Sequence, residues 1–278
     1  MPSSVKGSIQ TKSPWNQHVP HWPNTARHGR QSELGAVRRM HGAENVPPWM
    51  RGLVGNRDDA SAQLRSPFSE LGRCWARRHA SVLILLSGNG SPSGYQRPDD
   101  TGVLLLRRSN DMRRGAGEIA FPGGFAEPGD RSPIDTALRE AREEVGLETA
   151  SVNPVAVLDG CVMFPYPYVV TPVIAHWATV GPTRVVDPAE TSEVMHVPLS
   201  WLIDPANRTA IRWGVIGRRL SMPVFQVNDM VIWGFTALVL SAIIDAAGWE
   251  RPWCADGTYD LRPGTALTLR NKLRGAAL

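Results

Sequence analysis

The chain has 278 residues, of which 42% are hydrophobic and 20% are charged. This composition is typical of a globular protein with a substantial core, and the length suffices for one large domain or two small ones. No run of about 18 apolar residues is present, so we expect no transmembrane helix, no membrane partner and no signal peptide. The three cysteines, Cys74, Cys161 and Cys254, are far apart in the sequence. We therefore expect reduced thiols in a cytoplasmic protein rather than a disulfide framework or a zinc site.

The net charge of +4 conceals an uneven distribution. Residues 1–80 contain 12 Lys and Arg against 5 Asp and Glu, whereas the rest of the chain is slightly acidic. A basic segment can bind nucleic acid, but here the basic residues are scattered among Pro, Ser and Gly with no helical stripe. Residues 1–45 also lack any periodic apolar pattern. We therefore predict a disordered basic N-terminal extension over 1–45, and nucleic acid is a disfavoured partner.

The pattern beyond residue 45 predicts one α/β domain over residues 46–253. Short apolar runs bounded by Gly, Pro and Asp are typical of strands. In chain order, the predicted strands are 80–87, 101–109, 152–160, 168–178, 192–204 (leading into a short helix) and 220–229. Residues 231–248 predict a buried core helix, because the apolar run ends at Asp245, short of the ~20 residues that a membrane span needs. Residues 254–278 carry little pattern and are expected to be a C-terminal tail.

One segment of the domain, "FPGGFAEPGDRSPIDTALREAREEVGL" (121–147), has the signals of a capped amphipathic helix. Ser132 and Pro133 are typical of the N-cap and first helical positions, and Gly146 is typical of a helix end. Apolar residues recur between them at intervals of three and four, as on the buried face of a helix. These residues are Ile134, Ala137, Leu138, Ala141 and Val145.

Three acids of this helix, Glu140, Glu143 and Glu144, are three and four positions apart, so their carboxylates crowd two adjacent turns. They form either a solvated acidic face or a site for a hard divalent cation such as Mg²⁺ or Mn²⁺, which takes oxygen ligands. The second interpretation also explains Gly123 and Gly124. Without side chains, these glycines let the backbone approach a metal or phosphate, and a carbonyl such as that of Gly124 can serve as a ligand.

The same stretch resembles the Nudix box, whose usual form is G-x5-E-x7-R-E-U-x-E-E-x-G-U, with U aliphatic. Here Gly124 is followed by five residues, Asp130, eight residues and "REAREEVGL" (139–147). Asp130 replaces the usual Glu, and the second spacer is one residue longer. The fold implied by this resemblance is the α/β Nudix fold, a mixed β-sheet sandwiched between α-helices.

Neighbouring segments resemble the coenzyme A pyrophosphatase subgroup of Nudix hydrolases, which carries a motif similar to LLTxR…HxGxxxFPGG. The segment "LLLRRSNDMRRGAGEIAFPGG" (104–124) matches it at several positions, but Arg107 stands in place of Thr, and Gly115 or Ala116 in place of His. The matching positions are Leu105, Leu106, Arg108, Arg113, Gly117 and 121–124. The segment "VIWGFTALVL" (231–240) is also similar to a helix of this subgroup.

The resemblance implies hydrolysis of a diphosphate with Mg²⁺ or Mn²⁺ as cofactor. Glu140 and Glu144 would be the main metal ligands, joined by the Gly124 carbonyl, and Glu143 a further ligand or the base that activates water. Arg139 would orient a carboxylate of the preceding loop, either Glu127 or Asp130. A further acid, Glu193, is either a distant contributor to the site or a surface residue.

Coenzyme A or an acyl-CoA is the expected substrate, with 3′,5′-ADP and 4′-phosphopantetheine as products. Four arginines precede the box, and of these Arg108 and Arg113 are the predicted contacts to substrate phosphates. The segment "FPYPY" (164–168) is either an aromatic wall for the substrate or a rigid turn. Alternative substrates are ADP-ribose, nucleotide sugars or damaged nucleotides, and a non-catalytic nucleotide-binding domain is the alternative from another class. The sequence leaves a homodimer open.

Overall fold

The computed structural model of the protein describes residues 46–65, 76, 78–89, 96–163, 168–215, 218–253 and 259–261. The predicted extension over 1–45 lies outside the described residues, so its disorder stays a prediction. No helix in these described ranges is both long and apolar enough to cross a membrane.

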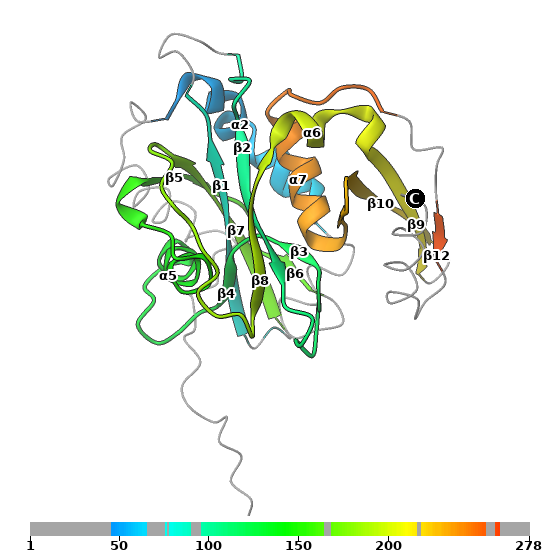
Figure 1. The fold of residues 1–278 in the computed structure, drawn as a ribbon. Helices are drawn as coiled ribbons and strands as arrows, with labels where there is room; N and C mark the ends of the chain where they lie inside the picture. The colour runs from blue at the N-terminus through cyan, green and yellow to red at the C-terminus, as the bar shows by residue number, and fades with distance from the viewer. Residues whose placement is uncertain are drawn as a thin grey trace, which may run out of the picture.

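The central element is a mixed eight-stranded sheet (Figure 1). Its strands are β1 (Arg78–Ser87), β2 (Gly102–Arg108), β3 (Ile119–Ala120), β4 (Gly123–Phe125), β5 (Val152–Val157), β6 (Cys161–Val162), β7 (Tyr168–Trp177) and β8 (Thr191–Pro198). Strands β1 and β7 are parallel, and the other pairs are antiparallel. Both faces of β1 and β2 are covered, which explains why their sequences are continuously apolar rather than alternating.

Strand β4 enters the sheet between β1 and β2 and carries the glycine loop with it. Strand β1 pairs with β2 only at Leu86 and Ser87, whereas residues 80–82 pair with β4 instead. Between these two pairings, the Leu83 N–H donates to the Pro122 carbonyl oxygen at 2.8 Å. The predicted hairpin of the first two strands is therefore opened at one end, and the box loop fills the opening.

One face of this sheet is covered by α5 (Pro133–Val145), as Figure 1 shows. Its apolar residues pack with those of β1, β2, β5 and β7 in a compact core. The fully buried members include Leu83, Leu85, Leu104, Ala137, Ala141, Val145, Val173 and Ala175. Because this apolar stripe faces the sheet, the charged residues of α5 lie at the rim of the interface.

The opposite face is covered by a second group of helices around α7. This group comprises α7 (Gly234–Ala246), α2 (Arg51–Gly55), α3 (Arg57–Gln63) and α6 (Leu199–Ile203), with the 3₁₀ turns η2 (Pro48–Met50) and η4 (Pro205–Asn207). A third 3₁₀ turn, η3 (Thr149–Ser151), precedes β5. Helix α7 lies between the main sheet and a second, four-stranded sheet (Figure 1). That sheet contains β9 (Arg208–Val215), β10 (Arg218–Val227), β11 (Met230–Ile232) and β12 (Tyr259–Leu261).

The predicted mixed sheet between helices is confirmed, with two local corrections. The long helix begins at Gly234, because Met230–Ile232 form strand β11 against β10. The predicted C-terminal tail contains strand β12, which pairs in parallel with β9, and the rest of 254–278 lies outside the described residues. In both cases the strand is defined by a partner elsewhere in the chain.

Candidate active site

Helix α5 begins and ends where the sequence predicts. The Ser132 Oγ accepts a hydrogen bond from the Asp135 N–H at 3.2 Å, and Pro133 occupies the first helical position. Gly146 ends the helix with a φ of +64°, in the left-handed region that favours glycine, and its N–H donates to the Arg142 carbonyl oxygen. These caps set where the helix starts and stops on the sheet, and hence which glutamates face β4.

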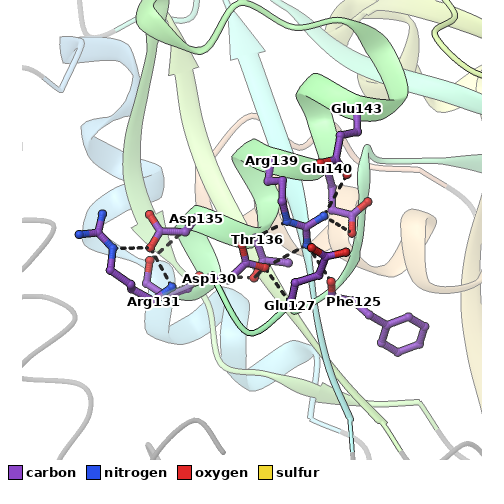
Figure 2. Close-up of polar contacts among 10 residues, drawn as sticks. Phe125, Glu127, Asp130, Arg131, Asp135, Thr136, Arg139, Glu140 and Glu143 are labelled. Carbon is purple, nitrogen blue, oxygen red and sulfur yellow. Dashed lines mark hydrogen bonds and ion pairs between the residues drawn. The ribbon is translucent and has the colours of Figure 1, made fainter. Parts of the chain in front are cut away.

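Arg139 is the centre of the polar network on α5 (Figure 2). Its Nε and Nη2 donate to the two carboxylate oxygens of Asp130 at 3.1 and 2.9 Å, a bidentate pair. Nη2 also donates to the Phe125 carbonyl oxygen at 2.9 Å. Nη1 lies 3.0 Å from both Glu140 Oε1 and Glu143 Oε2. One guanidinium thus ties the box loop, the end of β4 and two helix acids together.

Asp130 is the loop carboxylate that this network orders. Its side chain is only 6% exposed, and its Oδ2 also accepts from the Glu127 N–H and the Thr136 hydroxyl, both at 2.9 Å. Burial alone would raise the pKa of Asp130, but the hydrogen bonds from Arg139, Glu127 and Thr136 outweigh it and leave the pKa below its ordinary value. Glu127 and Asp130 were the two carboxylates expected beside Arg139, and Asp130 is the one that forms the bidentate pair. Its lowered pKa keeps it ionised there.

Glu140 lies directly against the glycine loop. A Cβ on Gly124 would lie 2.5 Å from the Glu140 carboxyl carbon, so only glycine permits this approach. Burial raises the pKa of Glu140, and this rise is only partly offset by Arg139 and is reinforced by Glu143 and Glu127. The backbone of Gly124 and the carboxylate of Glu140 are thus adjacent, as a shared metal site requires.

Glu144 is the most deeply buried acid of the helix, with 9% of the residue exposed. Its Oε2 accepts a hydrogen bond from the Gly123 N–H at 2.8 Å. Burial raises the pKa of Glu144 to about 7, and the nearby charges of Glu140 and Glu190 add to the rise, while Gly123 and Arg108 oppose it. A solvated acidic face does not describe this residue, since it is a desolvated carboxyl held against β4.

Two residues of opposite charge from outside α5 lie near Glu144. Arg108 ends β2, and Glu190 lies in the turn before β8. The Ser109 N–H donates to the Glu190 carbonyl oxygen at 2.8 Å, which holds the two segments together. The sequence motif predicts Arg108 as a site residue but does not predict Glu190. The only sequence signal for Glu190 was an acid immediately before a predicted strand.

Glu143 is placed differently from its two neighbours. Its side chain is 52% exposed, and its described polar contact is the ion pair with Arg139. It therefore lies at the solvent side of the network, whereas Glu140 and Glu144 lie at the glycine loop. A direct role at the metal or in activating water requires the Glu143 side chain to leave Arg139.

The remaining predicted residues lie at the rim of this site or outside it. Arg113 is exposed on the loop between β2 and β3. Glu193 does not join the carboxylates of α5, because it pairs with Arg107 at 2.9 Å. The Arg107 Nη2 also binds Asp229 at 3.0 Å, which ties the turn between β10 and β11 to β2. Alternate residues of a strand face opposite sides, so Arg107 and Arg108 serve different surfaces.

The aromatic segment 164–168 is described only at its last residue. Residues 164–167 lie outside the described part, so neither the aromatic wall nor the rigid turn is tested there. Tyr168 packs edge-on against Phe125, with ring centroids 5.4 Å apart. This contact brings one aromatic ring of the segment to the end of β4, one residue from Gly124.

The donor set at the glycine loop fits a hard divalent cation. Glu140, Glu144 and the Gly124 backbone supply only oxygen ligands, and the two buried carboxyls lack cationic partners sufficient to keep their pKa values at ordinary levels. Within the described ranges, no three His, Cys, Asp or Glu side chains already converge on one point. A third carboxylate ligand from Glu143 would therefore require its side chain to move away from Arg139.

The family model and the curated relatives that match this chain belong to one family, the Nudix hydrolases. The NUDIX domain model matches residues 77–214, which include β1, the glycine loop and α5. An uncharacterized Nudix hydrolase, NudL, of Photorhabdus laumondii is 32% identical over 163 residues, covering 59% of this chain and 81% of that protein. The human mitochondrial coenzyme A diphosphatase NUDT8 is 31% identical over 162 residues, covering 58% of this chain and 65% of that protein. Among solved structures, a Nudix hydrolase from M. smegmatis, RenU, matches with a TM-score of 0.36 and 24% identity, over 46% of this chain and 74% of that one.

Proposed function

Since this chain belongs to the Nudix hydrolases, enzymes that hydrolyse phosphorus-containing anhydrides, we propose that it acts on coenzyme A or an acyl-CoA. Water adds to one phosphorus of the diphosphate, and the bridging P–O bond breaks. The products are 3′,5′-ADP and a 4′-phosphopantetheine species. The predicted boundaries of the catalytic domain, 46 and 253, are kept as part of this proposal.

The observation that carries the proposal is the position of the segment 104–124, which resembles the coenzyme A subgroup. It contains most of β2, strand β3 and the first two residues of β4, and β4 lies against α5. Its Arg108 lies close enough to Glu144 to lower the pKa of that carboxyl. The similarity to a relative named for coenzyme A hydrolysis supports the same substrate.

Nudix hydrolases generally use divalent metal ions, and we assign Mg²⁺ or Mn²⁺ to the glycine loop of this chain. Glu140, Glu144 and the Gly124 carbonyl would hold it, with Glu143 completing the set when it leaves Arg139. When bound, such an ion would supply positive charge to offset the negative charge that develops on the phosphoryl oxygens during hydrolysis. Oxygen ligands with several retained waters suit both of these metals.

The residues of this chain have separable tasks in the proposed reaction. Glu143, the most exposed of the three acids, would accept a proton from water once it leaves Arg139, while Glu144 is held against Gly123. Arg139 positions the loop through Asp130 rather than touching substrate. Arg108 binds the diphosphate beside Glu144, and Arg113 adds positive charge at the rim for substrate phosphates.

A substrate panel with Mg²⁺ and with Mn²⁺ tests the proposal. Coenzyme A, acetyl-CoA, ADP-ribose, NADH, a diadenosine polyphosphate and 8-oxo-dGTP are incubated with the full chain, and products are resolved by chromatography. We expect the highest kcat/KM for coenzyme A or acetyl-CoA. A higher value for ADP-ribose or 8-oxo-dGTP would reject the substrate, and hydrolysis of none of them would favour a domain that only binds nucleotides.

A further inference from the structure

An arginine outside the box lies over an aromatic ring beside the site. The guanidinium carbon of Arg78 lies 3.4 Å from the centroid of the Phe125 ring. Tyr168 also packs against Phe125, with the two ring planes nearly perpendicular and their centroids 5.4 Å apart. A cation over an aromatic face is attracted by the ring electrons, and the stacking restricts the orientation of the guanidinium plane. Arg78 is exposed, so the N–H edges of this fixed plane remain accessible.

All three residues stand at strand ends, at one end of the sheet. Arg78 and Tyr168 are the first residues of the parallel strands β1 and β7 and are register partners. Phe125 is the last residue of β4 and pairs with Ala80. No further strand residue extends β1, β7 or β4 beyond this cluster.

The cluster is adjacent to the candidate metal site but on the other side of β4. The Cβ direction of Gly124 points at the Glu140 carboxylate, so the side chain of the next residue, Phe125, points the opposite way. Figure 2 shows the Phe125 ring directed away from the carboxylates, while its carbonyl oxygen accepts from Arg139. One backbone residue therefore joins the two places, which are separated by the thickness of a single strand.

The other described cations near the site are engaged differently. Arg139 is shared among Asp130, Glu140 and Glu143, and Arg107 is held by Glu193 and Asp229. The charge of Arg108 lowers the pKa of Glu144, on the side of β4 where the diphosphate is proposed to bind. Within the described part of the chain, Arg78 has the Phe125 ring as its contact and forms no ion pair. No described side chain thus neutralises its charge, which is why we consider it as a site for an external anion.

We propose that Arg78, oriented by Phe125 and Tyr168, is a specificity-determining residue that binds a substrate phosphomonoester separate from the hydrolysed diphosphate. This inference rests on the proposed function, in which the second phosphate is the 3′-phosphate of coenzyme A. A single ribose separates the 3′-phosphate from the diphosphate, which matches two anion sites on either side of one strand. A guanidinium fork binds phosphate oxygens in bidentate fashion, and a ring-stacked guanidinium loses less freedom on binding.

The first experiment measures binding without catalysis. Isothermal titration with 3′,5′-ADP and with 5′-AMP, in EDTA, compares the wild type with Arg78→Gln, Phe125→Leu and the control Arg131→Gln. Arg131 is a suitable control because its side chain is 89% exposed and pairs only with Asp135 on the described surface. We expect the wild type and Arg131→Gln to prefer 3′,5′-ADP by about tenfold to a hundredfold, as charge-assisted bonds to phosphate imply.

In the same titration, Arg78→Gln should bind both nucleotides equally. Phe125→Leu should lower the preference by about two- to fivefold, since it keeps the charge and removes only the stacking. A preference that survives in Arg78→Gln would overturn the inference. Circular dichroism of each variant confirms that it is folded, and binding of 5′-AMP at the wild-type level confirms that the site is intact.

The second experiment separates this inference from the proposed function. The ratio of kcat/KM for coenzyme A to that for dephospho-CoA is measured for the wild type, Arg78→Gln and Arg113→Gln. We expect only Arg78→Gln to bring the ratio to about one, by lowering the value for coenzyme A alone. A collapse of the ratio in Arg113→Gln instead would reject Arg78 and leave the proposed function standing. If the wild type hydrolyses neither compound but Arg78 still determines the preference for 3′,5′-ADP, the phosphate site stands and the proposed reaction is wrong.

Discussion

Helices α5 and α7 have the same length and cover opposite faces of the main sheet, yet they are built on different principles. Both contain 13 residues. Helix α5 has one apolar stripe, a side-chain cap at Ser132 and an ionic network at its rim. Helix α7 has no side-chain N-cap, and eight of its 13 residues are buried between the main sheet, the second sheet and α3. The first helix positions charges and the second fills a core.

The two helices obtain their stability from different sources. Burial of apolar area contributes roughly 25 cal/mol per Å², so a helix whose residues are mostly apolar and buried, such as α7, needs no cap or ion pair to stay in place. A helix with buried carboxyls has less of this stabilisation, because desolvating Glu140 and Glu144 opposes folding. Substitutions in α5 should therefore change activity more than stability, and substitutions in α7 should do the reverse.

The largest expected effect is a loss of kcat/KM when the buried acids of α5 are replaced. Glu144→Gln and Glu140→Gln should each lower kcat/KM on the order of 10³-fold, about 4 kcal/mol of activation free energy, since each amide removes a charged metal ligand. The matched control is Glu148→Gln, an exposed glutamate just beyond the helix, which should stay within about twofold. Steady-state kinetics with Mg²⁺ measure this. Near wild-type activity in both α5 variants would reject the metal-site assignment.

The next effect is on the stability contributed by α7. Leu240 is fully buried, and Leu240→Ala should lower the free energy of unfolding by about 2–5 kcal/mol through lost burial and a cavity. The kcat/KM of the protein that remains folded should change little. Urea unfolding followed by tryptophan fluorescence gives the first quantity, and assays well below the midpoint give the second. If kcat/KM falls as steeply as in Glu144→Gln, the assignment of a catalytic role to α5 and a stabilising role to α7 is wrong.

A third test uses the pH dependence of the metal-free protein. The pKa of Glu144 is about 7 in the folded chain against an ordinary 4.5, so the folded state holds this proton more tightly than the unfolded state. The resulting stabilisation is complete below about pH 4.5 and is lost as the pH rises through 7. The loss is on the order of 3 kcal/mol. Urea unfolding in EDTA should show the wild type losing this much relative to Glu144→Gln between pH 4.5 and 8, and parallel pH profiles would contradict the burial of this carboxyl.

The smallest effect concerns the cap that distinguishes the two helices. Ser132→Ala removes the acceptor for the Asp135 N–H and should lower the free energy of unfolding by about 1 kcal/mol. Ser132→Asp keeps an acceptor and places a negative charge at the helix N-terminus, so it should restore most of this stability. Thermal unfolding compares the three proteins. Equal melting temperatures for Ser132→Ala and the wild type would show that packing alone holds α5, as it holds α7.

Local signals in the sequence were sufficient for much of the fold. The bounds of α5 follow from Ser132, Pro133 and Gly146, and β1, β5 and β7 lie where their apolar runs predict. The predicted start of α7 was wrong. Residues 231–232 are apolar and suit a helix or a strand equally, and only their pairing with β10 makes them a strand. Short strands such as β3, β4 and β12 were missed for the same reason, since two or three residues carry no periodic signal of their own.

The sequence by itself determined the box: the capped helix, the spacing of its three acids, the adjacent glycines and Arg139. These features depend on residues within a few turns of one another. Only the tertiary structure decided that Glu144 is buried while Glu143 is exposed, that Arg108 rather than Arg107 faces Glu144, and that Glu190 and Arg78 lie near the site. Burial and charge interactions depend on which strands surround a side chain, and those strands come from parts of the chain up to about a hundred residues apart, beyond the reach of any local pattern.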